Sequence, residues 1–266
     1  MNRLELIEQI QIKKSMLCVG LDTDMNKLPV DIERSMDGML KFNRAIIDST
    51  KRYAVCYKIN TAFYEQYGAK GWECMEATLN SIPSECLTIA DAKRGDIGNT
   101  SSMYARAFFE NMDFDAITVA PYMGEDSLKP FFEFKGKWVI CLGLTSNVGS
   151  KDFQSLKVNG KYLYEQVIET VSEWGTTDNL MFVTGATKAS DLKHIRTIVP
   201  NHFLLVPGVG AQGGSVADVC TNAANADGGL LINASRSILY ASNGIDYADK
   251  AAEEARFLQK EMAKYL

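Results

Sequence analysis

The sequence predicts an α/β protein that folds as a single-domain (β/α)8 TIM barrel with an extra N-terminal helix, over residues 1–266. Three observations predict this class. Short runs rich in Val, Ile, Leu and Ala recur along the chain, and segments with helical periodicity lie between them. The apolar runs are continuous rather than alternating, as expected for parallel strands covered on both faces. Eight strand–helix units also fit the length, because such barrels typically use about 250 residues.

The eight apolar runs are the predicted strands, and each ends in polar or glycine residues. In chain order they are residues 16–22, 54–60, 87–93, 116–122, 138–145, 180–187, 202–210 and 228–235. Their spacing matches strand–helix–strand units of about 30 residues. A doubly wound open sheet has the same rhythm, so the count of eight does not by itself exclude it.

Helices are predicted between and after the strands, where apolar residues recur at helical spacing. They cover residues 37–51, 100–110, 161–174, 190–199, 215–225 and 249–264. Ser190 and Ser215 stand where N-terminal caps are expected. No linker rich in Ser or Gly interrupts the pattern, so we expect one domain.

The composition argues against several classes of partner. With 28 Lys and Arg against 33 Asp and Glu, the net charge is -5. We therefore expect no nucleic acid or anionic membrane as a partner, because both need basic patches. No apolar stretch approaches the roughly 20 residues that span a bilayer, and the charged N-terminal segment lacks an export signal. Six cysteines without a C-x-x-C pair are typical of buried thiols, and we expect a cytoplasmic protein.

The shortage of histidine limits the chemistry. His194 and His202 are the two histidines of the chain, and no H-E-x-x-H motif or cysteine pair offers a zinc site. We expect both histidines to be structural and no metal to be bound. The chemistry must then come from Lys, Asp, Arg, Ser or backbone groups.

Charged residues gather at the predicted strand ends, where the active sites of such barrels lie. Asp91 and Lys93 end the third strand and are two residues apart, so their side chains point to the same side. Ionised groups in a cavity must pair, and we expect Asp91 and Lys93 to pair with each other and with Lys58. A lysine flanked by carboxylates stays an ammonium group and can donate a proton. A structural ion-pair network without function remains the alternative.

Residues 208–213 match G-x-G-x-x-G between a strand and a helix. A dinucleotide site would need an acidic residue about 20 positions later, but Ser235 and Arg236 stand there. Barrels commonly bind phosphate with the loops after strands seven and eight, and a guanidinium can grip phosphate with two hydrogen bonds. The pattern therefore favours a phosphate site, the alternative being a glycine turn that binds nothing.

The pattern Asp91-x-Lys93-x-x-Asp96-Ile97-x-Asn99-Thr100 resembles the signature of the orotidine 5'-phosphate decarboxylases, the last enzymes of UMP synthesis. The resemblance covers nearly the whole chain and is strongest to the longer bacterial subgroup. It implies decarboxylation of orotidine 5'-monophosphate to UMP and CO2 without a metal or organic cofactor.

The same resemblance implies a role for each site residue. Lys93 would donate a proton to C6 of the pyrimidine, with Asp91, Asp96 and Lys58 completing the catalytic network. The six substrate-binding residues would be Asp22, Thr100, Ser146, Gln212, Ser235 and Arg236. Asp22 would bind the ribose together with Lys58, and Ser146 would bind the pyrimidine. Gln212, Ser235 and Arg236 would lie at the phosphate. Ser235 occupies a place often held by glycine. Asp96 and Thr100 would reach into the partner's site, so we expect a homodimer.

Two other functions remain open at this stage. Sugar-phosphate decarboxylases and hexulose-phosphate synthases resemble the same family but use Mg2+, and they should need extra acidic ligands that are not seen after strands two and four. A non-enzymatic barrel that senses UMP-like ligands is the other alternative. The presence of Lys58, Asp91, Lys93 and Asp96 together argues against it, because ligand binding alone needs no proton donor.

Overall fold

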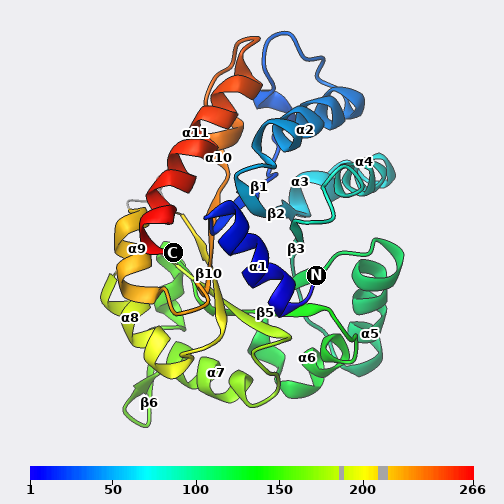
Figure 1. The fold of residues 1–266 in the computed structure, drawn as a ribbon. Helices are drawn as coiled ribbons and strands as arrows, with labels where there is room; N and C mark the ends of the chain where they lie inside the picture. Colours follow the sequence, from blue (N-terminus) through cyan, green and yellow to red (C-terminus); the bar gives the residue numbers. More distant parts are fainter. Residues whose placement is uncertain (186–188, 209–214) are drawn as a thin grey trace.

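Eight parallel strands close into a barrel in the computed structural model, which describes residues 1–185, 189–208 and 215–266 (Figure 1). The strands are β1 (Leu17–Gly20), β2 (Ala54–Asn60), β3 (Leu87–Arg94), β4 (Ala116–Val119), β5 (Trp138–Leu144), β8 (Leu180–Thr184), β9 (Phe203–Pro207) and β10 (Leu230–Ala234). β1 pairs with both β2 and β10, so the sheet has no free edge. The predicted barrel is confirmed and the open sheet is excluded.

Each predicted apolar run contains one strand, and burial explains why. Every residue of β1, β4, β8 and β10 is buried, as continuous apolar runs require when helices cover the outside of a filled barrel. The predicted strands 16–22 and 116–122 extend past the observed ends of β1 at Gly20 and β4 at Val119. β4 ends before Pro121, which begins the 3-10 turn η3 (Pro121–Met123). The final residues of the predictions 180–187 and 202–210 lie partly outside the described residues.

Helices surround the barrel between successive strands (Figure 1). The longer ones are α1 (Arg3–Lys13), α2 (Met36–Thr50), α4 (Ala69–Leu79), α5 (Gly98–Arg106), α6 (Glu125–Phe132), α7 (Leu163–Ser172), α8 (Ala189–Ile198), α9 (Val216–Ala223) and α11 (Tyr247–Met262). Short elements are η1 (Met25–Lys27), α3 (Ala62–Glu65), η2 (Ala107–Asn111), η4 (Val148–Asp152), α10 (Arg236–Leu239), η5 (Ala263–Tyr265) and the hairpin of β6 (Lys157–Val158) and β7 (Lys161–Tyr162). The six predicted helices are present, whereas α4 and α6 were not expected.

The extra N-terminal helix closes one end of the barrel. α1 begins at a capping box between Asn2 and Glu5 and buries Leu6 and Ile10. Arg3 on its first turn donates hydrogen bonds to the carbonyl oxygens of residues 177 and 201, which precede β8 and β9. The helix therefore lies over the end at which the strands begin (Figure 1). The opposite end, where the strands finish, is left for ligands.

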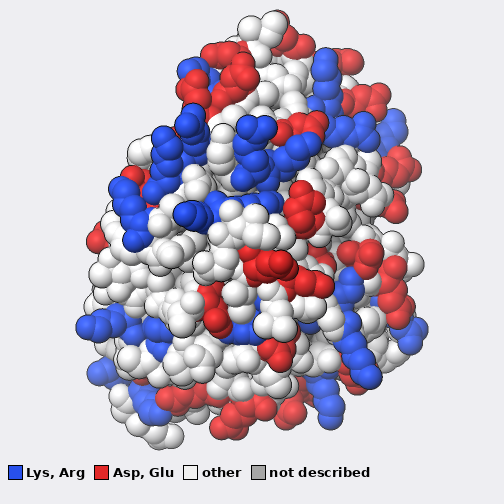
Figure 2. Space-filling view, viewed as in Figure 1, with Lys and Arg blue, Asp and Glu red and all other residues white. Residues whose placement is uncertain are grey.

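The surface carries both signs of charge. On the face seen in Figure 2, Lys and Arg side chains follow α11, and Asp and Glu gather nearer the centre. This mixture agrees with the small net charge of -5. Among the described residues, no helix combines the length and the apolar character needed to cross a membrane.

Candidate active site

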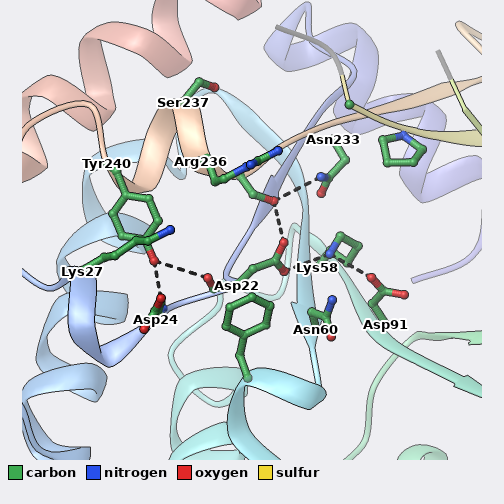
Figure 3. A pocket seen from close by; sticks show the side chains of 14 residues that line it. Asp22, Asp24, Lys27, Lys58, Asn60, Asp91, Asn233, Arg236, Ser237 and Tyr240 are labelled. Atoms are coloured by element: carbon green, nitrogen blue, oxygen red, sulfur yellow. Dashed lines mark hydrogen bonds and ion pairs between the residues drawn. The ribbon is translucent and has the colours of Figure 1, made fainter. Parts of the chain in front are cut away.

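Four of the predicted side chains form one chain of ion pairs at the open end of the barrel. Lys58 Nζ lies 3.0 Å from Asp22 Oδ1 and 3.1 Å from Asp91 Oδ2. Lys93 Nζ lies 2.6 Å from Asp91 Oδ1. Figure 3 shows Asp22, Lys58 and Asp91 in a row, with the ammonium group between the two carboxylates. The predicted pairing of Asp91 with Lys93 and Lys58 is present in the structure, and Asp22 joins it through Lys58.

The register of the strands brings these side chains together. Gly20 at the end of β1 lies opposite Lys58 on β2, and Asn60 on β2 lies opposite Asp91 on β3. Asp22 follows β1 by two residues and so reaches the same level as Lys58. Three consecutive strands therefore supply the ion-pair chain, with Asp22 following β1, Lys58 on β2, and Asp91 and Lys93 on β3.

The backbone at Lys93 is unusual. Its φ of 49° lies in the left-handed region, which is uncommon for a residue other than glycine. The register between β3 and β4 also shifts here, between Ala90 and Arg94. Thr118 on β4 supports the turn, because its hydroxyl accepts a hydrogen bond from Lys93 N and donates one to Asp91 Oδ1. Such strain persists where the surroundings enforce it, and it clusters at functional sites.

Burial and charge act against each other in this cluster. Burial alone would lower the pKa of Lys58, but the attraction of Asp22 and Asp91 outweighs it and raises that pKa well above its usual range. Burial alone would raise the pKa of Asp91, but Lys58 and Lys93 lower it well below its usual range. Lys58 and Asp91 are therefore both ionised at neutral pH. The side chain of Lys93 is 48% exposed, so its ammonium group remains accessible to a ligand.

A cavity of about 420 Å3 opens beside the ion-pair chain. Asp22, Lys58 and Asp91 line one part of it, and Arg236 lines another (Figure 3). The volume lies within the range of about 300–1,000 Å3 that small-molecule sites occupy. A ligand in this cavity would meet the two lysine-bonded carboxylates and the arginine at the same time.

Arg236 is the first residue of α10 and follows β10 by two residues. The residue is exposed, and among the described side chains no carboxylate pairs with it. Its guanidinium donors are therefore available to an anion. Ser235 lines the same cavity, and its hydroxyl donates to Asp22 Oδ2 at 2.9 Å, so its role at the phosphate stays a prediction. Gln212 lies outside the described residues.

Lys93 does not line the cavity itself and is joined to it through its ion pair with Asp91. Three further predicted residues also stand apart from the cavity lining. Ser146 follows β5 and packs against the backbone of Gly185 after β8. Asp96 accepts a hydrogen bond from Ile97 N at 2.7 Å, and within the described part of the chain it bonds to neither Lys58 nor Lys93. Thr100 is exposed on α5. Their proposed roles stay predictions.

Several lining residues were missed by the sequence analysis. Asn60 stands two positions after Lys58 on the same strand, so the period of two could have placed it on the same face. Lys27 and Tyr240 carried no such signal. Tyr240 Oη accepts a hydrogen bond from Asp24 N at 2.8 Å, and Lys27 Nζ lies 5.6 Å from the tyrosine ring centre. These residues meet only because η1 and α10 approach each other when the barrel closes.

A closed (β/α)8 barrel with lysines, aspartates and an exposed arginine at its open end defines a barrel enzyme that handles an anionic small molecule. Residues 15–251 match the model of the family described as Orotidine 5'-phosphate decarboxylase / HUMPS family. The chain belongs to this family.

Individual proteins agree with this assignment. The chain is 55% identical over 269 residues to an orotidine 5'-phosphate decarboxylase of Flavobacterium johnsoniae, covering 100% of this chain and 98% of that protein. A solved OMP decarboxylase of Leishmania donovani superposes with a TM-score of 0.83 at 36% identity, covering 98% of this chain and 100% of that one.

A second solved structure is longer than this chain. The UMP synthase of Leishmania donovani matches with a TM-score of 0.84 at 37% identity, over 96% of this chain but 56% of that one. Together these likenesses confirm the predicted resemblance and the predicted enzyme class, a carboxy-lyase.

Proposed function

We propose that this protein decarboxylates orotidine 5'-monophosphate to UMP and CO2, the last step of de novo pyrimidine nucleotide synthesis, in the cytoplasm. The observation that carries the proposal is the ion-pair chain of Asp22, Lys58, Asp91 and Lys93 beside the cavity. Relatives that share more than half of the residues over the whole chain carry the name of this reaction.

The chemical problem is the electron pair left on C6 of the pyrimidine. When the bond from C6 to the carboxylate breaks, CO2 departs and both electrons stay on C6. An ammonium group held at that carbon stabilises the developing charge and then supplies the proton. Lys93 fits this role, because Asp91 holds its Nζ at 2.6 Å while the side chain remains half exposed. After the transfer Lys93 is a neutral amine and regains a proton from water.

The remaining residues bind and orient the substrate. Asp91, kept as an anion by Lys58 and Lys93, would lie close to the departing carboxylate. Asp22 and Lys58 would contact the ribose hydroxyls, and Arg236 would hold the phosphate at the other side of the cavity. Binding energy from the remote phosphate can then be used to order the site around the reacting carbon. Ser146 and Gln212 are assigned to the pyrimidine and the phosphate by resemblance.

The arrangement also favours this reaction over a Mg2+-dependent one of the same family. Asp22 and Asp91 both give carboxylate oxygens to Lys58, and the second oxygen of Asp91 is taken by Lys93 and Thr118. Carboxylates engaged by cations in this way are poorly placed to ligate a metal. In the described part of the chain, no cluster of three or more His, Cys, Asp or Glu side chains is placed to hold one.

The direct test is an assay on chelator-treated protein. Purified protein is mixed with orotidine 5'-monophosphate, the loss of the substrate's ultraviolet absorbance is followed, and UMP is identified by chromatography. We expect turnover without added metal. No turnover would exclude the proposed function, and activity that returns only with Mg2+ would favour the synthase chemistry. Tight UMP binding without turnover would favour a sensor.

We further propose that the enzyme works as a homodimer. The segment that carries Asp96 and Thr100 and the turn after β4 expose several large apolar side chains, which are Ile97, Met103, Tyr122 and Met123. Apolar groups gathered near polar groups are typical of protein interfaces. A second copy on this face would cover them and would bring its Asp96 and Thr100 towards the neighbouring cavity.

Mixed dimers test whether the site is shared. Lys93→Ala and Asp96→Ala proteins should each be inactive alone. After the two are unfolded together and refolded, up to half of the dimers are mixed, and each mixed dimer holds one site with both residues intact. Activity should therefore reappear in the mixture. Absence of complementation, with mixed dimers demonstrated by differently tagged subunits, would rule out the shared site.

A further inference from the structure

Resting on the proposed function, we infer that Ser235 is a positioning residue. Asn233 orients the Ser235 hydroxyl, and this hydroxyl holds Asp22 in the ion-pair chain. Ser235, the neighbour of Arg236 in the sequence, thereby fixes the orientation of the carboxylate proposed to bind the ribose. The sequence placed Ser235 among the phosphate contacts. The hydrogen bonds around it indicate a different task.

The direction of each hydrogen bond is fixed by its neighbours. The thiol of Cys18 donates to Asn233 Oδ1 at 3.6 Å, so the amide nitrogen of Asn233 faces the other way. That nitrogen donates to Ser235 Oγ at 3.2 Å. Because Ser235 Oγ accepts there, its own proton is free for Asp22 Oδ2, 2.9 Å away. The hydroxyl therefore acts as a donor to the carboxylate.

Asp22 divides its two oxygens between Ser235 and Lys58. Oδ2 accepts from the serine, and Oδ1 accepts from Lys58 Nζ at 3.0 Å. Without the serine hydroxyl the carboxylate can rotate about its terminal torsion, which is broad for aspartate. Lys58 would follow, and so would Asp91, which shares that lysine. Ser235 thus acts on the reacting end of the site through two ion pairs.

The serine hydroxyl lies between the first and last strands, close to the backbone of Gly20. A Cβ added at Gly20 on β1 would lie 1.9 Å from Ser235 Oγ and 3.0 Å from Asn233 Oδ1. Asn233 is 7% exposed. The hydroxyl therefore fills the position above Gly20, and a larger residue at 20 would displace it.

The proposal predicts which ligands lose affinity in a Ser235→Ala variant. Loss of a hydrogen bond to a charged group should reduce binding about 10- to 100-fold. The contact holds the Asp22 carboxylate, which would bind the ribose that UMP and uridine share. Both ligands should therefore lose affinity by the same factor. Arg236→Gln should weaken UMP and leave uridine unchanged. The value of kcat for orotidine 5'-monophosphate should also fall in Ser235→Ala, because Lys58 and Asp91 shift.

Two further variants control for folding. Ser49→Ala removes a hydroxyl that bonds within its own helix α2 and should leave binding and turnover unchanged. Gly20→Ala displaces the hydroxyl without altering Ser235, so it should reproduce the loss in Ser235→Ala. The double variant Gly20→Ala/Ser235→Gly should recover part of the loss in folding stability, because the added methyl then has room.

The outcomes separate this proposal from the function on which it rests. Wild-type protein without turnover would refute the proposed function whatever Ser235 does. With an active wild type, Ser235→Ala turnover within about twofold of normal would overturn the positioning role. So would a weakening confined to UMP, which would make Ser235 a phosphate ligand. Failure of both Ser235→Ala and Gly20→Ala to fold would make the contact structural and would overturn it as well.

Discussion

The two ends of the barrel both contain buried cations, but they use them differently. At the closed end, the guanidinium of Arg196 donates to five backbone carbonyl oxygens, those of Val199, Pro200, His202, Ala223 and Gly229. Burial is the main cause that lowers the pKa of Arg196 to about 10, so it stays charged at neutral pH. The arginine thereby holds together the turns that lead into β9 and β10.

At the open end, the lysines bond to side chains. Lys58 and Lys93 donate to carboxylates, and the side chain of Lys93 is 48% exposed. Among the described residues Lys93 Nζ bonds to a single carboxylate, so this ammonium group keeps donors for a ligand. At the closed end Arg196 is fully used by backbone carbonyl oxygens and stabilises the fold, whereas at the open end Lys58 and Lys93 bond to carboxylates beside a cavity that a ligand can enter. Each of the following experiments tests one side of that distinction.

The largest effect is expected for Lys93→Ala. In the proposed mechanism this change removes the proton donor and the charge facing C6, so kcat/KM should fall at least about 10⁴-fold. The free energy of unfolding should change by at most about 1 kcal/mol, because the lost ion pair is half exposed. Steady-state kinetics and urea unfolding measure the two quantities. Activity within about tenfold of wild type would assign the proton transfer to another group.

Lys58→Met should affect both activity and stability, because Lys58 is buried between two carboxylates. We expect kcat/KM to fall about 10³-fold and the free energy of unfolding to fall by about 3 kcal/mol. Without Lys58, burial raises the pKa of Asp91, so protonation at lower pH should recover part of the stability. Lys260→Met, at an exposed lysine of α11, is the matched control. A difference in the free energy of unfolding between wild type and Lys58→Met that grows as the pH falls would contradict this account.

Arg196→Met should affect stability alone. Removing the shared donor leaves several carbonyl oxygens unpaired, so we expect a loss of about 3–5 kcal/mol in the free energy of unfolding. Below the unfolding temperature, kcat should stay within about twofold of wild type. Arg256→Met, at an exposed arginine of α11, should change neither quantity. A large fall in kcat without loss of stability would break the distinction between the two ends.

The smallest effect concerns His202, which lies beside Arg196 and Arg3 at the closed end. Burial, and then the two arginines, lower the pKa of its ring to about 4. The folded state therefore disfavours the protonated ring, and stability falls as the pH drops from about 6.5 towards 4. Between about pH 7 and pH 5 we expect a loss of about 1 kcal/mol, since the ring is partly exposed to solvent. His202→Leu should lose less over the same range in urea unfolding, and an equal loss would contradict the assignment.

The barrel could be predicted from sequence because its strands are apolar on both faces. The same reasoning missed α4 and α6, whose signals are weak. α4 begins at Ala69, is preceded by Gly68 as an N-cap without a side-chain hydrogen bond, and contains Gly71 in its first turn. α6 has eight residues and contains Pro130. Their stability comes from packing on the barrel rather than from local propensity.

The site could be predicted where its residues share a strand, as Asp91 and Lys93 do. Contacts between distant segments could not. The hydrogen bond from Ser235 to Asp22 joins residues 213 positions apart, and it exists only because β10 pairs with β1. Spacing along the chain carries no information about such a contact. The proposed roles of Asp96 and Thr100 lie further from a sequence argument, because they would depend on a second copy of the chain.

The pairing of β1 with β10 also decides when the site can form during synthesis. Asp22 follows the first strand to leave the ribosome, whereas its serine partner follows the last one. Until β10 has emerged, the exposed edges of β1 and β9 remain unpaired and open to other chains. A nascent chain that stops before β10 can form lysine–aspartate pairs between β1, β2 and β3, but its site lacks both Ser235 and Arg236. Binding of nucleotide therefore reports that the barrel has closed.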